Sequence, residues 1–167
     1  VYGSPEAVAQ IDALDFRNEI PVETVALEPF REVQAGHLAV TPIPGSHKRD
    51  ELCLTYVVQS DSAIVPFAWD TGLYSEESLQ WLAKRQVDLL VIECTQGTHD
   101  IPSRSHMGLD GVLQTRDRLV AGGLTQPDVR TIITHFSHNI GMLHDELEAI
   151  VRPHGIEVAW DGMVVEC

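Results

Sequence analysis

Two apolar runs alternate with helical patterns in the second half of the chain, and this alternation constrains the fold more than any other feature. Residues 87–93 are apolar apart from Asp88 and a final glutamate, which is typical of a strand that is covered on both faces. Residues 129–134 form a second run of this kind, and helical spacing of apolar residues occupies 109–121 and 140–151. The pattern predicts a mixed sheet with helices packed on its outer face, an α/β fold.

The first half of the chain predicts mainly short strands. Helical spacing occupies residues 5–20, and a capping signal at Ser75 begins a second helix that we expect to run to residue 84. Strand patterns occupy 22–27, 38–43, 52–59 and 63–69, and two more, 156–160 and 163–165, close the chain. We expect Pro42, Pro44 and Gly45 to break the 38–43 strand.

Size and charge narrow the class of protein. A chain of 167 residues suits a single domain over 1–167 with a full hydrophobic core. The net charge of −14 repels long polyanions, so a small substrate or cations are expected as partners rather than a long nucleic acid. No apolar stretch approaches the roughly 18 residues of a membrane span, which predicts a cytoplasmic protein with no membrane partner.

The three cysteines, Cys53, Cys94 and Cys167, do not indicate special chemistry. They are an odd number, they are scattered, and no C-x-x-C pair occurs. A disulfide framework and a cysteine-rich zinc finger are therefore not indicated. We expect reduced thiols in the core.

Four residues with metal-binding or acid–base side chains are expected at the same edge of the predicted sheet. His47, Asp70 and His135 each follow a predicted strand, and His106 lies in the polar loop that follows Glu93. Strand ends at one edge of a sheet form the usual ligand crevice of layered α/β folds. Two histidines and an aspartate from separate strand ends make a chemically sensible partial ligand set for zinc, manganese or iron.

Each member of this set also has a plain structural interpretation. A lone histidine near a strand end is more often a surface or satisfied core residue, and His37, His144 and His154 are interpreted in this way. Asp-Thr-Gly at 70–72 is by itself more often a turn with a helix cap than a catalytic motif. The spaced set is more specific than any one of its members.

Five short motifs resemble one known family. They are VTPIPGSH at 40–47, WDTG at 69–72, SH at 105–106, THFSH at 134–138 and WDGM at 160–163. Together they resemble the metallo-β-lactamase superfamily, most closely its cyclic-phosphodiesterase branch of phosphonate-degradation enzymes, which is related to the tRNA 3′-end-processing nucleases. The resemblance implies an αββα sandwich, of which this chain is the later portion.

The resemblance also implies a role for each site residue. His47 and His135 would be terminal ligands of two divalent metal ions, manganese or zinc, and Asp70 would bridge the two metals. His106 would be a non-ligand acid or phosphate-stabilising group, and His138 a supporting or substrate-side catalytic residue. The implied reaction is hydrolysis of small phosphate esters, cyclic ones included, by a hydroxide that the two metals share.

The sequence departs from the family at one important point. The family carries a His-x-His-x-Asp-His run in its first half that supplies the other four ligands, and no such run occurs here. The chain could be a fragment, a natural truncated relative or a repurposed binding domain, and its opening at Val1 favours a fragment. Without the first half, the inner face of the sheet should be an exposed apolar patch, which we expect a homodimer partner or the missing segment to cover.

Two functional hypotheses follow. The first is the later half of a metal-dependent phosphodiesterase that needs the absent segment for activity. The second is a non-catalytic interaction module that retains a vestigial metal site. Because similar metal pairs also hydrolyse thioesters, lactams and lactones, the fold alone does not choose the ester.

Overall fold

Seven strands form one mixed sheet in the computed structural model, which describes residues 1–14, 21–99, 101–123, 126 and 128–166. The strands follow one another in sequence order across the sheet. The first four pair antiparallel, and the last four pair parallel. They are β3 (Val33–Ala35), β4 (Leu38–Pro44), β5 (Leu54–Gln59), β6 (Ile64–Ala68), β7 (Leu89–Glu93), β8 (Arg130–Thr134) and β9 (Ile156–Val158). The predicted mixed sheet is confirmed.

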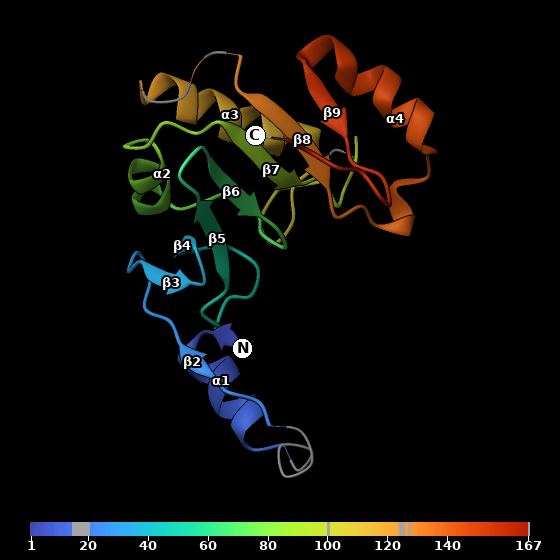
Figure 1. Ribbon diagram of the computed structural model, residues 1–167. Helices are drawn as coiled ribbons and strands as arrows, with labels where there is room; N and C mark the ends of the chain where they lie inside the picture. The colour runs from blue at the N-terminus through green and yellow to red at the C-terminus, as the bar shows by residue number, and fades with distance from the viewer. Residues whose placement is uncertain (15–20, 100, 124–125, 127, 167) are drawn as a thin grey trace.

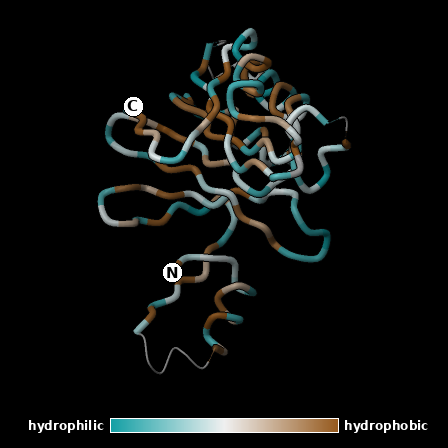
Figure 2. Tube along the Cα trace, turned by 90° about the vertical axis from the view of Figure 1, so that its right-hand side faces the viewer, coloured by the Kyte–Doolittle hydropathy of each residue, from teal (hydrophilic) through white to brown (hydrophobic). Residues whose placement is uncertain are grey.

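The N-terminal residues form a small unit beside this sheet. It contains β1 (Tyr2–Gly3), α1 (Pro5–Asp12) and β2 (Val25–Ala26), and its two strands pair parallel. Figures 1 and 2 show the unit set apart from the body of the molecule in two perpendicular views. The helix predicted over residues 5–20 ends at Asp12, and residues 15–20 lie outside the described part of the chain.

Three helices pack against the large sheet and build the main core. They are α2 (Glu76–Leu82), α3 (Leu109–Ala121) and α4 (His144–Val151), and Figure 1 shows α4 beside β9. Their apolar residues pack with Ile92 of β7 and Ile133 of β8, both fully buried. None of the helices in the described ranges is long and apolar enough to cross a bilayer.

The opposite face of the sheet carries a second, smaller apolar cluster. Leu89 and Ile132 are its buried centre, and Met163 and Val165 pack on it. The strand predicted over 163–165 is wrong, because these residues lie on the face of the sheet and no strand pairing includes them. An apolar hollow of about 310 Å³ is open on this face.

Two further predictions are wrong in part: the break expected at Pro42, Pro44 and Gly45 comes only after Pro44, and one predicted helix is two separate elements. Strand β4 continues through Pro42, whose carbonyl accepts a hydrogen bond from the Phe30 amide on the side away from β5. A strand residue's N and O point the same way, so the missing N–H of Pro42 costs no bond to β5. The helix predicted over 140–151 is divided into η2 (His138–Ile140) and α4 by Gly141, which has a φ of +68°. A second short 3₁₀ turn, η3 (Arg152–His154), follows α4.

Gly72 allows two loops to pack closely beside the strand ends. A Cβ atom at this position would lie 2.3 Å from the carbonyl oxygen of Arg104, which is too close for any side chain. The next residue, Leu73, donates its amide to the Ser103 carbonyl at 3.0 Å. The loop after β6 is therefore fixed against the loop before α3.

We expect Gly72→Ala to lower the free energy of unfolding by about 1–3 kcal/mol, because the added methyl group forces two backbone segments apart. Gly3→Ala is the matched control, since its Cβ would meet Ala7 at an ordinary 3.5 Å. Denaturant unfolding of both variants measures the difference. Equal stability of the two variants would contradict the close packing at Gly72.

Candidate metal centre

The candidate site lies where four strands end at the same edge of the sheet. Strands β4 and β6 both pair antiparallel with β5, so they run in the same direction. Strands β7 and β8 run parallel to β6. The topology therefore brings together the segments that follow these strands, which carry His47, Asp70, His106 and His135.

One carboxylate oxygen of Asp70 lies at the centre of these side chains. Its Oδ1 is 3.3 Å from His47 Nε2, 3.6 Å from His106 Nδ1 and 3.9 Å from His135 Nε2. The His47 and His106 rings meet edge-on, with centroids 4.9 Å apart. The side chain of Asp70 is 53% exposed, so this cluster faces the outside of the molecule.

Glu93, the last residue of β7, contacts the cluster from the interior of the protein. Its side chain is fully buried, and its Oε1 accepts hydrogen bonds from the Thr71 amide at 2.5 Å and His106 Nδ1 at 3.1 Å. Its Oε2 accepts from the amides of Thr95 at 3.3 Å and Met107 at 3.0 Å. A buried carboxylate needs such donors, and these come from three segments around the site.

The contact with Glu93 sets the orientation of the His106 ring. A carboxylate can only accept hydrogen bonds, so His106 Nδ1 is the donor in this pair. The other ring nitrogen, Nε2, is left for a ligand or a proton. A carboxylate that fixes a histidine in this way is common in the second layer around metal sites.

Thr95 orients His135 in a comparable way. The Thr95 hydroxyl donates to the His135 carbonyl oxygen at 2.9 Å, and its oxygen also lies 2.9 Å from His135 Nδ1. Because the single proton of the Thr95 hydroxyl is used in the bond to the carbonyl oxygen, His135 Nδ1 must donate to the Thr95 oxygen. The lone pair of neutral His135 is then on Nε2, the nitrogen that faces Asp70.

Two candidate ligands have strained backbones. Asp70 and His135 have φ angles of +54° and +59°, and Phe30 is the one other non-glycine residue with positive φ in the described part of the chain. Left-handed conformations cost of order 1–3 kcal/mol per residue and concentrate at functional sites. The strain at both residues is an independent indication that this edge of the sheet is a functional site.

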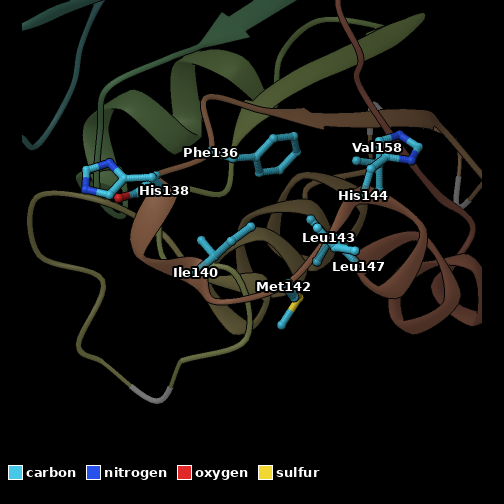
Figure 3. Close-up of a pocket in the computed structure, with 9 residues that line it drawn as sticks. Phe136, His138, Ile140, Met142, Leu143, His144, Leu147 and Val158 are labelled. Atoms are coloured by element: carbon cyan, nitrogen blue, oxygen red, sulfur yellow. The ribbon is translucent and has the colours of Figure 1, made fainter.

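The structure places His138 outside the central cluster. Its side chain is exposed at the start of η2. It lines a separate hollow of about 390 Å³, whose other lining residues include Phe136, Ile140 and Leu147. Figure 3 shows His138 and His144 on either side of Ile140, Met142 and Leu143. The catalytic role predicted for His138 stays a prediction.

Sequence reasoning overlooked Thr95 and Thr71 as supporting residues. Thr71 is fully buried, and its hydroxyl oxygen accepts the Ser46 amide at 2.8 Å. Both threonines lie within two residues of a candidate ligand or of Glu93, which is the only signal in the sequence that marks them. A threonine near a strand end is too common to be selected on this basis.

Cys94 takes no part in the site chemistry. Its thiol is fully buried, and burial together with the neighbouring Glu93 charge raises its pKa to about 12. The thiolate is the nucleophilic form, so this residue is inert at neutral pH. Cys53 and Cys94 are both free, as predicted, but Cys53 is only half-buried, so the prediction of a core thiol is wrong for it. Cys167 lies outside the described residues.

The donor set fits divalent cations. One ligand atom from each of Asp70, Glu93, His106 and His135 lies within 4.8 Å of the others, and His47 contacts the same Asp70 oxygen. Glu93 is less suited than the others to ligation because its oxygens are occupied by four donors. Exposed imidazole nitrogens and a carboxylate suit zinc or manganese.

Comparison with protein families gives one match. The profile described as a beta-lactamase superfamily domain covers residues 1–136, most of this chain. The matched range includes Asp70, Glu93, His106 and His135. Comparison with curated proteins gives no match.

Solved structures share the fold at low sequence identity. The metallo-beta-lactamase fold protein YhfI from Bacillus subtilis aligns with a TM-score of 0.74 at 22% identity, over 99% of this chain and 64% of that protein. Zn²⁺-bound PqqB from Methylobacterium extorquens aligns at 0.70 and 15% identity, over 99% and 64%. Unliganded yeast PDE1 aligns at 0.64 and 15% identity, over 96% and 58%. The predicted fold is confirmed, and the chain spans about two thirds of the length of these proteins or less.

We expect Glu93→Gln to lower the free energy of unfolding by about 1–3 kcal/mol. Each oxygen of Glu93 faces two donors, so the amide NH₂ group of glutamine must face N–H groups in either orientation. Denaturant unfolding measures the loss, and ¹⁵N NMR of the imidazoles should show His106 losing its preference for a protonated Nδ1.

Glu157→Gln is the matched control, because that carboxylate pairs with Arg130 at the surface and its loss should cost less than about 1 kcal/mol. A Glu93→Gln protein as stable as this control, with an unchanged His106 tautomer, would show that Glu93 does not support the site.

Proposed function

The chain belongs to the beta-lactamase superfamily, and on that premise we propose that it is the metal-binding part of a hydrolase that cleaves small phosphodiesters. Cyclic esters are included, and we place the protein in the cytoplasm. The observation that carries the proposal is the convergence of His47 and His135 on Asp70 at the sheet edge. The cyclic-phosphodiesterase branch remains a prediction from the five sequence motifs.

We assign His47, Asp70 and His135 as ligands of two divalent cations, manganese or zinc. The assignment is supported by the fixed His135 tautomer and by the left-handed backbones of Asp70 and His135. Bound divalent cations supply Lewis acidity and make a water molecule nucleophilic near neutral pH. The residues of this chain hold and orient the cations.

His106 is proposed as the general acid of the reaction. In its protonated form it would donate the Nε2 proton to the leaving oxygen as the P–O bond breaks. The proposal is supported by the hydrogen bond from Nδ1 to Glu93, which leaves Nε2 as the free nitrogen. His138 is assigned to the substrate side, next to the hollow that begins at Phe136.

Activity is proposed to need further ligands from a His-x-His-x-Asp-His segment, which this sequence does not contain. Three ligands are too few to hold two cations firmly. The net charge of −14 favours a small ester over a long nucleic acid.

We also propose that the inner face of the sheet is covered by a second copy of the chain or by the segment that carries this run. The proposal is supported by the open apolar hollow around Phe67 and Val91. Trp69 and Trp160 line the same hollow and are about half exposed, which is unusual for tryptophan in a soluble monomer.

Metal binding is the first test. The chain joined to the His-x-His-x-Asp-His segment should bind Zn²⁺ or Mn²⁺ in isothermal titration, and His47→Ala, Asp70→Asn and His135→Ala should each weaken binding by more than about tenfold. His37→Ala is the matched control, because His37 is exposed in the turn before β4, at the opposite end of that strand from His47. Absence of metal binding, or equal losses in the control, would exclude the metal centre and favour an interaction module.

Catalysis by His106 is the second test, made on the chain joined to the His-x-His-x-Asp-His segment and loaded with metal. His106→Ala should lower kcat by about 10²–10⁴-fold for an alkyl phosphodiester, and by much less for a 4-nitrophenyl ester. The difference arises because a good leaving group needs little protonation. His154→Ala is the control, and equal losses for both esters would exclude His106 as the acid.

The covered face is tested by the assembly state. We expect a homodimer in sedimentation equilibrium, and Phe67→Glu should shift it to monomer because a charge cannot be buried in the apolar hollow. A wild-type chain that is monomeric at all concentrations excludes the homodimer. Loss of the monomeric state on adding the missing segment would then assign the face to that segment.

A further inference from the structure

A mostly apolar hollow lies between the segment that follows β8 and helix α4. It has a volume of about 390 Å³, and Figure 3 shows His138 and His144 at its two ends. No carboxylate of the described residues lines it, in a chain with a net charge of −14. Its apolar lining residues are Phe136, Ile140, Met142, Leu143, Leu147 and Val158.

The hollow borders the candidate metal centre along the chain. Phe136 directly follows His135, and consecutive Cα atoms are about 3.8 Å apart. The next amide, that of Ser137, donates to the carbonyl oxygen of Thr95 at 3.3 Å, and Thr95 is the residue that orients His135. A substrate held at His135 therefore has the hollow within reach.

Contacts within the protein form the hollow before any ligand binds. A Cβ atom at Gly97 would lie 3.1 Å from the Cβ atom of Ile140, so the loop after Thr95 packs directly against Ile140. The carboxylate of Glu146 accepts the amide of Leu143 at 2.7 Å and fixes the start of α4. A preformed site of this kind loses less entropy when it binds a ligand.

The rim of the hollow leaves apolar surface in water. Leu143 is 74% exposed, and Met142 beside it is half-buried. Covering such surface gains roughly 25 cal/mol per Å². The volume lies at the lower end of the roughly 300–1,000 Å³ of small-molecule pockets, and a dry cavity of about 150 Å³ already accepts benzene. A group of the size of one ring therefore fits.

We propose that this hollow binds an apolar, ring-sized group of the substrate, carried by the ester that is cleaved. This inference rests on the proposed function, because it places the ester at His135 and Asp70. The ring-sized group would remove Met142 and Leu143 from water while the ester stays at the strand ends. The preferred substrate is then a phosphodiester of an aromatic or alicyclic alcohol.

The first test is an NMR titration of the metal-free full chain with benzyl alcohol, a neutral probe. The alcohol should shift the resonances of residues 136–143, and Met142→Gln/Leu143→Gln should weaken its binding by at least about threefold. Ile150→Gln/Val164→Gln is the matched control, because it removes two exposed apolar side chains outside the hollow. The control should leave binding unchanged, and glycerol, titrated in parallel, should not bind.

The second test is made on the chain joined to the His-x-His-x-Asp-His segment and loaded with metal. The value of kcat/KM should be about tenfold higher for benzyl methyl phosphate than for dimethyl phosphate, although the two alcohols are similar leaving groups. The Met142→Gln/Leu143→Gln variant should narrow this ratio, and the Ile150→Gln/Val164→Gln variant should keep it.

Each outcome has a definite meaning. Shifts at Trp69 and Trp160 in place of residues 136–143 would move the apolar group to the inner face of the sheet and overturn the proposal. Shifts of the hollow residues with protein concentration alone would make the hollow an interface and also overturn it. Because the titration uses metal-free protein, alcohol binding without any hydrolysis would contradict the proposed function alone. Hydrolysis with neither alcohol binding nor a preference for the benzyl ester would contradict this inference alone.

Discussion

The buried carboxylate of Glu93 is the interaction on which the rest of the site depends. A carboxylate in a protein interior is costly unless several donors surround it, and Glu93 has three backbone amides and one imidazole. The amides belong to Thr71, Thr95 and Met107, in the segments after β6, after β7 and before α3. One buried group therefore holds together the loops that carry Asp70, His106 and the partner of His135.

The strained backbones of Asp70 and His135 have a related meaning. Each residue immediately or closely follows a parallel strand, and each adopts a left-handed conformation that a side chain disfavours. The strain is tolerated because the surrounding loops are fixed by Glu93 and by the contact of Gly72 with Arg104. A rigid frame that aims both side chains at one point is what a metal centre requires.

The surroundings of the site differ from the surface of the chain as a whole. A chain with a net charge of −14 has a hollow beside His47 that is lined by Lys48, Arg49 and Arg104 together with Glu51. A second, mostly apolar hollow includes Phe136, the residue after His135. Basic side chains beside His47 agree with the small anionic ester of the proposed function. The apolar hollow on the inner face is lined by Trp69 and Thr134, the chain neighbours of Asp70 and His135, and in the proposed function this face serves assembly.

The sequence by itself determined the class of fold, most strand positions, the limits of the 109–121 helix and the four side chains that meet at the strand ends. Apolar runs, capping residues and glycines are local signals, so they suffice for these features. Tertiary structure alone decided that residues 163–165 lie on the sheet, that Pro42 stays within β4, and that Thr95 orients His135. Each of these depends on a partner far along the chain, 40 residues away for Thr95, and local patterns carry no information about such partners.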